Sequence, residues 1–126
     1  MTSCTIELGW PSRRLNPNFR QHHMALAKTR KQAKEATRWE CIAQGIPRQI
    51  CAERLVASFT FLPPDNRRRD LDNAIAACKA LTDGIAAHIG VDDSKWVQTY
   101  EFGEPVKGGK VIVNLRWTPC NHPVTV

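Results

Sequence analysis

The fold is decided by the stretch Arg54-Leu55-Val56-Ala57-Ser58-Phe59-Thr60-Phe61-Leu62. This run of β-branched, aromatic and aliphatic residues predicts a strong β-strand. Pro63-Pro64 follows directly and ends the strand, because proline has no amide hydrogen to give to a sheet. Residues 65–69 then form a turn that leads into a helix.

The expected helix runs from about Leu71 to His88 and carries a clear apolar stripe at helical spacing. The stripe consists of Ala74, Ile75, Cys78, Leu81, Ile85 and Ile89. Gly90 ends this segment, and Asp92-Asp93-Ser94 is expected to be a turn or the start of an edge strand.

The remaining elements flank this central strand and helix. Residues 5–10 form a short first strand, and residues 18–44 form a long, mostly exposed helix that ends at Gly45. Residues 97–102 and 111–117 are expected to be two strands of a hairpin, joined by a loop with Lys107-Gly108-Gly109-Lys110. From Thr118 onward, residues 118–126 are expected to be a loosely attached tail.

The predicted order is therefore strand, helix, strand, helix, strand, strand. Helices packed on one face of a small mixed sheet are the simplest way to bury both helical stripes. We expect a single α+β domain that spans residues 1–126, because 126 residues are enough for one core and too few for two.

Composition narrows the class of protein. The chain has an ordinary apolar content of 42%, no apolar run long enough to cross a bilayer, and no signal-peptide pattern at residues 1–7. These features predict a cytoplasmic protein with no membrane partner. The five cysteines, Cys4, Cys41, Cys51, Cys78 and Cys120, are scattered and never form a CxxC pair, which favours free thiols over a zinc site.

The charge is strongly basic and unevenly placed. The net charge is +6, and residues 13–38 hold eight basic residues against a single acid, Glu35. Such a balance favours a polyanionic partner, although a solubilising surface is the plain alternative.

A concentrated motif links this positive charge to negative charge. Arg67-Arg68-Arg69-Asp70-Leu71-Asp72-Asn73 sets three arginines beside two aspartates, and Asp92-Asp93 follows about twenty residues later. Each acid has a structural explanation: Asp70 as a helix N-cap, Asp72 near the positive end of the helix dipole, and Asp92-Asp93 as turn formers. A functional explanation joins them, because carboxylates held close together repel one another unless a cation binds between them.

The joint assignment is a metal site that acts on phosphate. Asp70, Asp72 and one of Asp92 and Asp93 are expected to bind one or two Mg²⁺ ions, which prefer oxygen ligands and commonly bridge carboxylates to phosphate. Such a site can activate water for in-line attack on a phosphodiester and stabilise the leaving oxygen. Lys79 lies about two helical turns after Asp72 and is placed to neutralise charge on the phosphate.

These residues resemble the RusA family of Holliday junction resolvases, which are common in phages and prophages. The resemblance starts with Leu8-Gly9-Trp10-Pro11-Ser12, ahead of Asn16 and Arg20. It continues through the arginine-rich Asp70-Leu71-Asp72-Asn73 segment, Lys79 with Asp83-Gly84-Ile85, and Val91-Asp92-Asp93. It ends at Lys107-Gly108-Gly109-Lys110. In the family pattern the lysine stands about three residues earlier, at Ala76 here, and an extra helical turn keeps Lys79 on the same face.

The resemblance implies a homodimer, bacterial or phage-encoded, that resolves four-way DNA junctions by paired nicks in recombination and repair. It implies Mg²⁺ or Mn²⁺ as the cofactor, no nucleotide cofactor, and Asp70, Asp72, Asp93 and Lys79 as catalytic residues. Arg67, Arg68 and Arg69 are expected to contact phosphate, with Arg13, Arg14 and Arg20 on the same surface. Two alternatives remain: a nuclease for other branched or flapped DNA, and a non-catalytic DNA-binding module whose aspartates are helix caps.

Overall fold

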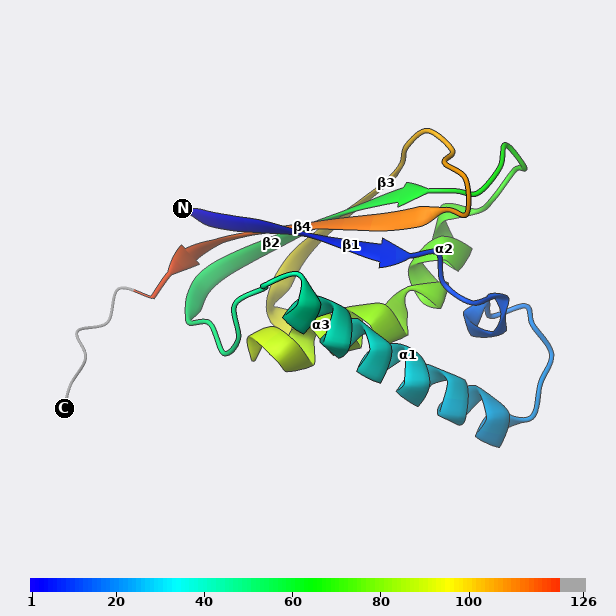
Figure 1. Ribbon diagram of the computed structural model, residues 1–126, viewed down its shortest axis with the longest axis horizontal. Coiled ribbons are helices and arrows are strands. Elements are labelled where there is room, and N and C mark those ends of the chain that lie inside the picture. The colour runs from blue at the N-terminus through cyan, green and yellow to red at the C-terminus, as the bar shows by residue number, and fades with distance from the viewer. Residues whose placement is uncertain (121–126) are drawn as a thin grey trace.

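The computed structural model describes residues 1–120 and shows one mixed β-sheet with its helices on one side (Figure 1). In chain order the elements are β1 (Thr2–Gly9), η1 (Arg13–Leu15), α1 (His23–Ala43), β2 (Ala52–Leu62), α2 (Leu71–Ala77), α3 (Lys79–Ile89), η2 (Asp93–Lys95), β3 (Trp96–Phe102) and β4 (Lys110–Pro119). The predicted α+β class and single small domain are confirmed. No helix among these residues is long and apolar enough to span a bilayer.

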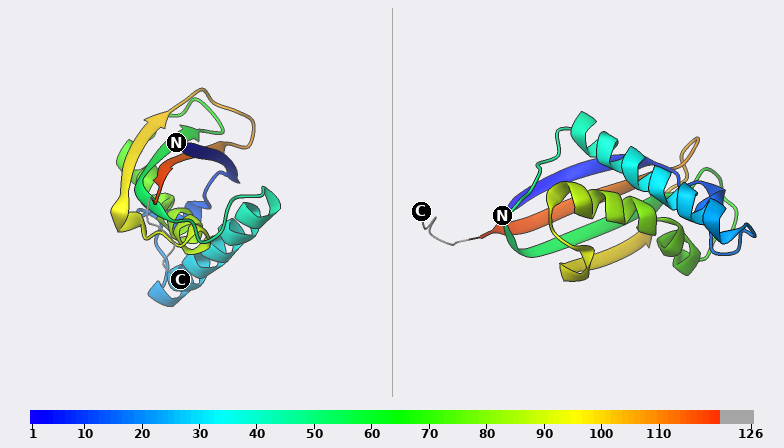
Figure 2. Two further views of the ribbon diagram at one scale, coloured as in Figure 1. Left: turned by 90° about the vertical axis from the view of Figure 1, so that its left-hand side faces the viewer. Right: turned by 90° about the horizontal axis from the view of Figure 1, so that it is seen from below.

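The four strands lie in the order β1-β4-β2-β3. β2 pairs parallel with β3 and antiparallel with β4, and β4 pairs antiparallel with β1. β2 buries alternate residues, Leu55, Ala57, Phe59 and Phe61, so one face of the strand carries the core. The helices cover this face and leave the opposite face of the sheet open (Figure 2).

The predicted hairpin of the last two strands is wrong. β2 lies between β3 and β4, so these two strands do not pair. The loop that joins them crosses the end of β2, where the Gly103 amide donates to the Phe61 carbonyl and the Val106 amide donates to the Pro63 carbonyl. The loop composition resembles a hairpin turn, but the pairing is decided by the apolar faces of the strands.

The second predicted helix is divided in two at Cys78. The Thr82 amide and the Thr82 hydroxyl both donate to the Cys78 carbonyl, at 3.0 and 3.2 Å. The division lies where the Cys78 backbone, with φ −85° and ψ −6°, departs from α-helical values. The predicted stripe is confirmed on α3, where Leu81, Ile85 and Ile89 are buried, and Gly90 ends this helix with a left-handed backbone of φ +76°.

The predicted exposure of the long helix is also confirmed, because Thr37 and Cys41 are its buried residues. α1 lies against α3 where Gly84 faces the backbone of α1. A Cβ atom at Gly84 would lie 2.6 Å from the Lys34 carbonyl oxygen and 2.7 Å from Thr37 Cβ. Glycine at this position therefore sets how closely the two helices approach.

We expect Gly84→Ala to lower the free energy of unfolding by about 1–3 kcal/mol, as overpacking of a fixed core does. The better helix propensity of alanine offsets up to about 1 kcal/mol of this loss. Urea denaturation followed by circular dichroism measures the effect. Gly9→Ala is the matched control, because a Cβ atom there meets nothing within 4 Å. Equal stability of both variants would mean that α1 and α3 are not held at this distance.

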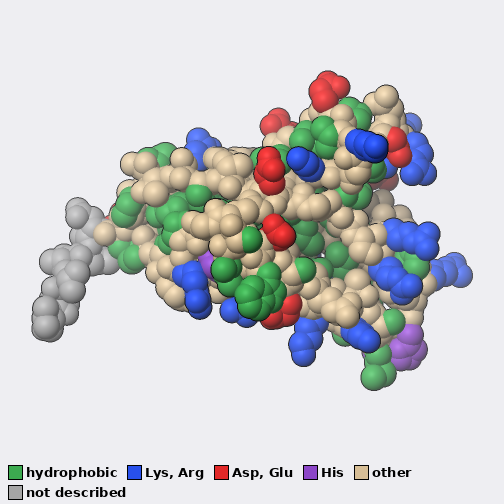
Figure 3. Space-filling view, viewed as in Figure 1, with side chains coloured by type: hydrophobic (Ala, Val, Ile, Leu, Met, Phe, Trp, Pro, Cys, Tyr) green, Lys and Arg blue, Asp and Glu red, His purple; other side chains and the backbone are tan. Residues whose placement is uncertain are grey.

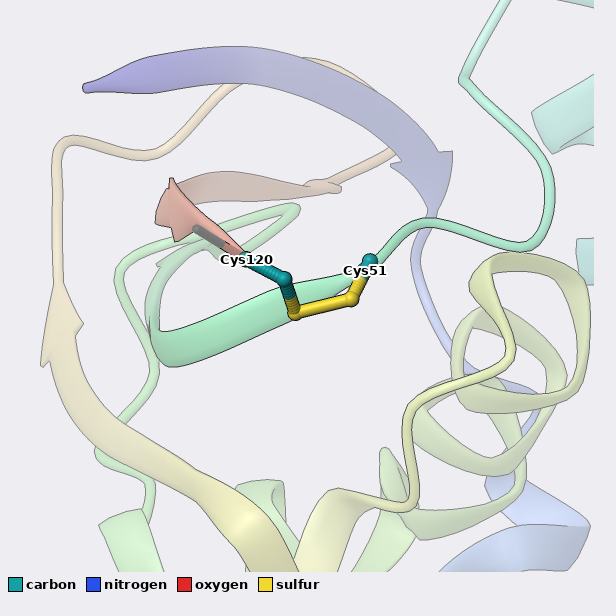
Figure 4. The surroundings of a disulfide bond; sticks show 2 residues. All are labelled: Cys51 and Cys120. Atoms are coloured by element: carbon teal, nitrogen blue, oxygen red, sulfur yellow. A yellow bond between two sulfur atoms is a disulfide. The ribbon is translucent and has the colours of Figure 1, made fainter. Parts of the chain in front are cut away.

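A disulfide joins Cys51 to Cys120, so the prediction of five free thiols is wrong (Figure 4). Ala52 pairs with Pro119 in the sheet, and this register brings the two flanking cysteines opposite each other with a Cα–Cα distance of 5.3 Å. Cys4, Cys41 and Cys78 are free. Burial raises the pKa of the Cys78 thiol to about 12, which keeps it protonated and unreactive.

The tail expected from Thr118 does not begin there, because Thr118 and Pro119 belong to β4 and Cys120 is bonded to Cys51. The rest of that prediction, residues 121–126, lies outside the described residues.

Candidate functional site

An open pocket of about 810 Å³ lies where the segment after β1, the end of β2 and the start of α2 meet. Its apolar lining includes Trp10, Phe61, Ala74 and Ala77. Its polar lining includes Ser12, Arg13, Asn16, Arg67, Arg68, Arg69, Asp70 and Asn73. The arginine-aspartate motif predicted from the sequence therefore forms one wall of a pocket.

Asp70 stands at the N-cap position of α2, but its side chain makes no capping hydrogen bond. The Asp70 carbonyl accepts the Ala74 amide at 3.2 Å and begins the helix, while the carboxylate lines the pocket. Asp72 lies exposed on the first turn of the same helix. The capping explanation of Asp70 thus lacks the hydrogen bond on which it depends.

Two of the three arginines are ordered by Asp65, a residue that the sequence analysis did not single out. Asp65 accepts ion pairs from Arg67 at 3.2 Å and from Arg69 at 2.9 Å. Hydrogen bonds from Arg69 and then from Arg67 hold the pKa of Asp65 well below its ordinary value. Arg68 is exposed and has no ion pair with any residue from 1 to 120. The sequence did offer a signal for these ion pairs, because Asp65 stands two residues before the arginine run that begins at Arg67.

Trp10 is the second residue that the sequence analysis missed as a site residue, because it was treated as the end of the first strand. The Arg69 guanidinium carbon lies 5.6 Å from the centre of the Trp10 ring, and the Trp10 ring meets Phe61 edge-on at 6.4 Å. A Cβ atom at Gly109 would lie 2.9 Å from Trp10 Cβ, so the β3–β4 loop also closes on this side chain. Trp10 is therefore held as a fixed wall of the pocket.

Lys79 and Asp93, both predicted as catalytic, are brought together. The Lys79 ammonium lies 2.5 Å from Asp93 Oδ2 and 2.9 Å from Asp83 Oδ1. The hydrogen bond to Asp93 is the main cause that raises the pKa of Lys79, so the ammonium stays charged at neutral pH. The spacing of Lys79 from Asp83, noted in the sequence, corresponds to an i,i+4 pair on α3.

The two members of the later acidic pair differ. The Asp93 side chain is 18% exposed and turns toward Lys79. Asp92 is exposed and accepts a hydrogen bond from the Ser94 hydroxyl, which lowers the pKa of the Asp92 carboxyl. Asp93 is therefore the better placed of the two to act together with the lysine.

The other predicted phosphate contacts lie on the same end of the molecule. Arg13 and Arg14 pack against the ring of Phe19, at 5.7 and 5.8 Å from its centre, and Arg20 is exposed nearby in the chain. Lysine and arginine side chains gather where η1, the start of α1 and the β2–α2 loop meet (Figure 3, right). This basic end includes the arginines of the pocket.

The chemistry of the acids fits magnesium, which takes carboxylate oxygens and needs one or two of them when substrate phosphates and waters complete its shell. Asp70 offers such an oxygen in the pocket, with Asp72 two residues along the chain. Within residues 1–120, no three histidine, cysteine or acidic side chains gather closely enough to hold a metal by themselves. The structure thus brings Lys79 to Asp93, and places Asp70 with the arginines.

No family model matches the chain. An uncharacterized protein from Xylella fastidiosa (strain Temecula1 / ATCC 700964) is 32% identical over 115 residues, which cover 88% of this chain and 74% of that protein. The chain belongs to the family of this Xylella protein. Among solved structures, the periplasmic domain of Helicobacter pylori MotB is 16% identical with a TM-score of 0.40, over 88% of this chain and 79% of that chain.

The nuclease activity predicted from the sequence gives Lys79 a test: Lys79→Met is expected to slow phosphodiester cleavage by roughly 10–100-fold, with little change in stability. In that prediction the ammonium neutralises charge on the phosphate, and an ion pair whose lysine is 58% exposed contributes only about 0–1 kcal/mol to folding. Single-turnover cleavage rates and thermal melting measure the two effects. Lys95→Met in the neighbouring turn is the matched control. A fall in melting temperature that parallels the loss of rate would mean that Lys79 is only structural.

Proposed function

We propose that this protein is a magnesium-dependent, structure-selective endodeoxyribonuclease that resolves four-way DNA junctions by paired nicks in recombination and repair. The observation that carries the proposal is the Asp70 carboxylate, which is free of a capping bond and shares a pocket with Arg67, Arg68 and Arg69. A carboxylate beside three arginines combines a ligand for a divalent cation with partners for phosphate.

Each residue has a role in this proposal. Arg68 and Arg69 hold the phosphates of the strand, and Asp65 keeps Arg69 in place. Asp70 and Asp72 would hold the magnesium ion, which when bound supplies an acidified water and a positive charge for the phosphate. Lys79 and its partner Asp93 do not line the pocket themselves, and Lys79 would supply a charged ammonium to the DNA from the start of α3.

The basic end of the molecule supports a polyanionic substrate. Arg13 and Arg14 lie on this end with the pocket arginines, and the chain carries a net charge of +6. A four-way junction is a dense polyanion, so binding is expected to weaken steeply with salt. Symmetric nicks in two strands require one site on each side of a two-fold axis, and we propose a homodimer for this reason.

We also propose that the protein acts in the cytoplasm, of a bacterium or of a phage-infected cell. Cytosolic glutathione and thioredoxin keep most thiols reduced. Cys51 and Cys120 are then expected to be thiols in the cell and to join on oxidation.

A panel of labelled DNA substrates tests the proposal. A four-way junction, a flap, a Y-shaped fork and a linear duplex are incubated with the protein and Mg²⁺ or Mn²⁺, and the products are resolved on denaturing gels. We expect nicks in the junction and none in the duplex. Cleavage of the flap alone would change the substrate to other branched DNA, and binding without any nick would make the protein a DNA-binding module.

A further inference from the structure

The pocket beside Asp70 has two kinds of lining that phosphate binding alone does not explain. Part of its lining is apolar, where Phe61 and Ala77 of the core lie against it. One wall is the Trp10 ring with the Arg69 guanidinium over it. Aromatic rings and guanidinium planes are the surfaces on which unpaired nucleobases stack.

The rim of the same pocket carries groups that match the edge and the backbone of a nucleotide. Asn73 presents a side-chain amide, which can donate to and accept from the hydrogen-bonding edge of a base. Asn16 presents the donors of its amide, because its Oδ1 already accepts the Asn18 amide. The Asn73 amide makes no hydrogen bond with the described part of the chain, so its donors and acceptor are available. Arg13 and Arg68 on the rim match the flanking phosphates.

We propose that this pocket binds one unpaired nucleotide of the DNA strand, with its base against Trp10 and its phosphates on the arginines. The inference rests on the proposed function and specifies how that site selects its substrate. A base at a branch point has lost a stacking neighbour, so moving it into a pocket costs least there. The bound nucleotide would bring its phosphodiester to Asp70, which lines the same pocket.

The test compares two single-stranded probes of equal charge in EDTA, where no cleavage occurs. One is a twelve-nucleotide deoxythymidine oligonucleotide, and the other is an abasic deoxyribose-phosphate chain of the same length. We expect the wild type to bind the thymidine probe roughly tenfold more tightly, the typical effect of one stacked base. Trp10→Ala is expected to bind both probes equally, and Trp10→Phe to keep a preference.

Trp39→Ala is the matched control, because Trp39 is 67% exposed on α1 and does not line the pocket. It is expected to keep the full preference for bases. Asn73→Ala removes no internal hydrogen bond and is expected to reduce the preference for bases severalfold. This second variant keeps the test possible if Trp10→Ala fails to fold. Equal binding of both probes by the wild type overturns the inference, even if junctions are cleaved. A base preference without any cleavage supports the inference and contradicts the proposed function.

Discussion

Asp70→Asn is expected to abolish junction cleavage and to leave junction binding intact. The change removes one negative charge and one strong metal ligand, but keeps the size of the side chain and all of the neighbouring arginines. We expect the cleavage rate to fall roughly 10²–10³-fold or more, as it does when a group that stabilises the transition-state charge is removed. Single-turnover cleavage and gel-shift binding in EDTA measure the two quantities on the same preparation.

Glu104→Gln in the β3–β4 loop is the matched control, because it also neutralises an exposed acid and does not line the pocket. It is expected to cleave at the wild-type rate. If binding and cleavage fell equally in a folded Asp70→Asn protein, Asp70 would shape the DNA surface and would not act in catalysis.

The stability of an alanine variant separates the two explanations of Asp70. A capping side chain replaced by alanine costs about 1 kcal/mol or more. Because the Asp70 side chain makes no capping bond, Asp70→Ala is expected to change the free energy of unfolding by less than about 0.5 kcal/mol. A larger loss would return Asp70 to the role of a helix cap.

Removal of the disulfide is expected to lower the free energy of unfolding by about 4 kcal/mol at most. Cys51 and Cys120 are 69 residues apart, and the loop-closure entropy of the unfolded chain rises with that separation. Denaturation with and without a reductant measures the difference for the wild type. Mass spectrometry after alkylation of the air-oxidised, unfolded protein is expected to find three reactive thiols, those of Cys4, Cys41 and Cys78.

The double variant Cys51→Ser/Cys120→Ser provides the control, since a reductant should not change its stability further. Junction cleavage by this variant is expected to be unchanged below its melting temperature. The disulfide closes the start of β2, whereas the pocket lies at the other end of that strand, beside Phe61. Five reactive thiols in the air-oxidised wild type would contradict the presence of the bond.

Local signals explain which parts of the fold are predictable from the sequence. Pro63-Pro64 ends β2, and Gly90 ends α3 with a left-handed backbone that glycine adopts readily. Strand pairing is a long-range property, so the composition of the β3–β4 loop predicted a hairpin that does not form. The Cys51–Cys120 bond depends on the same pairing and leaves no local pattern.

The site is also predictable only where its residues are close in the sequence. The proximity of Lys79 and Asp83 follows from helical spacing, and the place of the arginines beside Asp70 follows from their adjacency in the chain. Trp10 reaches this wall from a segment about sixty residues away, through contacts with Arg69 and Phe61 that no sequence spacing encodes. The contact of Lys79 with Asp93 likewise depends on how α3 returns to the sheet.

Metal-dependent cleavage of a branched junction would distinguish a resolvase from a DNA-binding module, and it can be measured on both strands at once. A synthetic four-way junction with both continuous strands labelled is incubated with the protein in Mg²⁺ and, in parallel, in EDTA. We expect nicks at related positions in both strands in Mg²⁺ and none in EDTA. Junction binding without a nick in either Mg²⁺ or Mn²⁺ would contradict the proposed function.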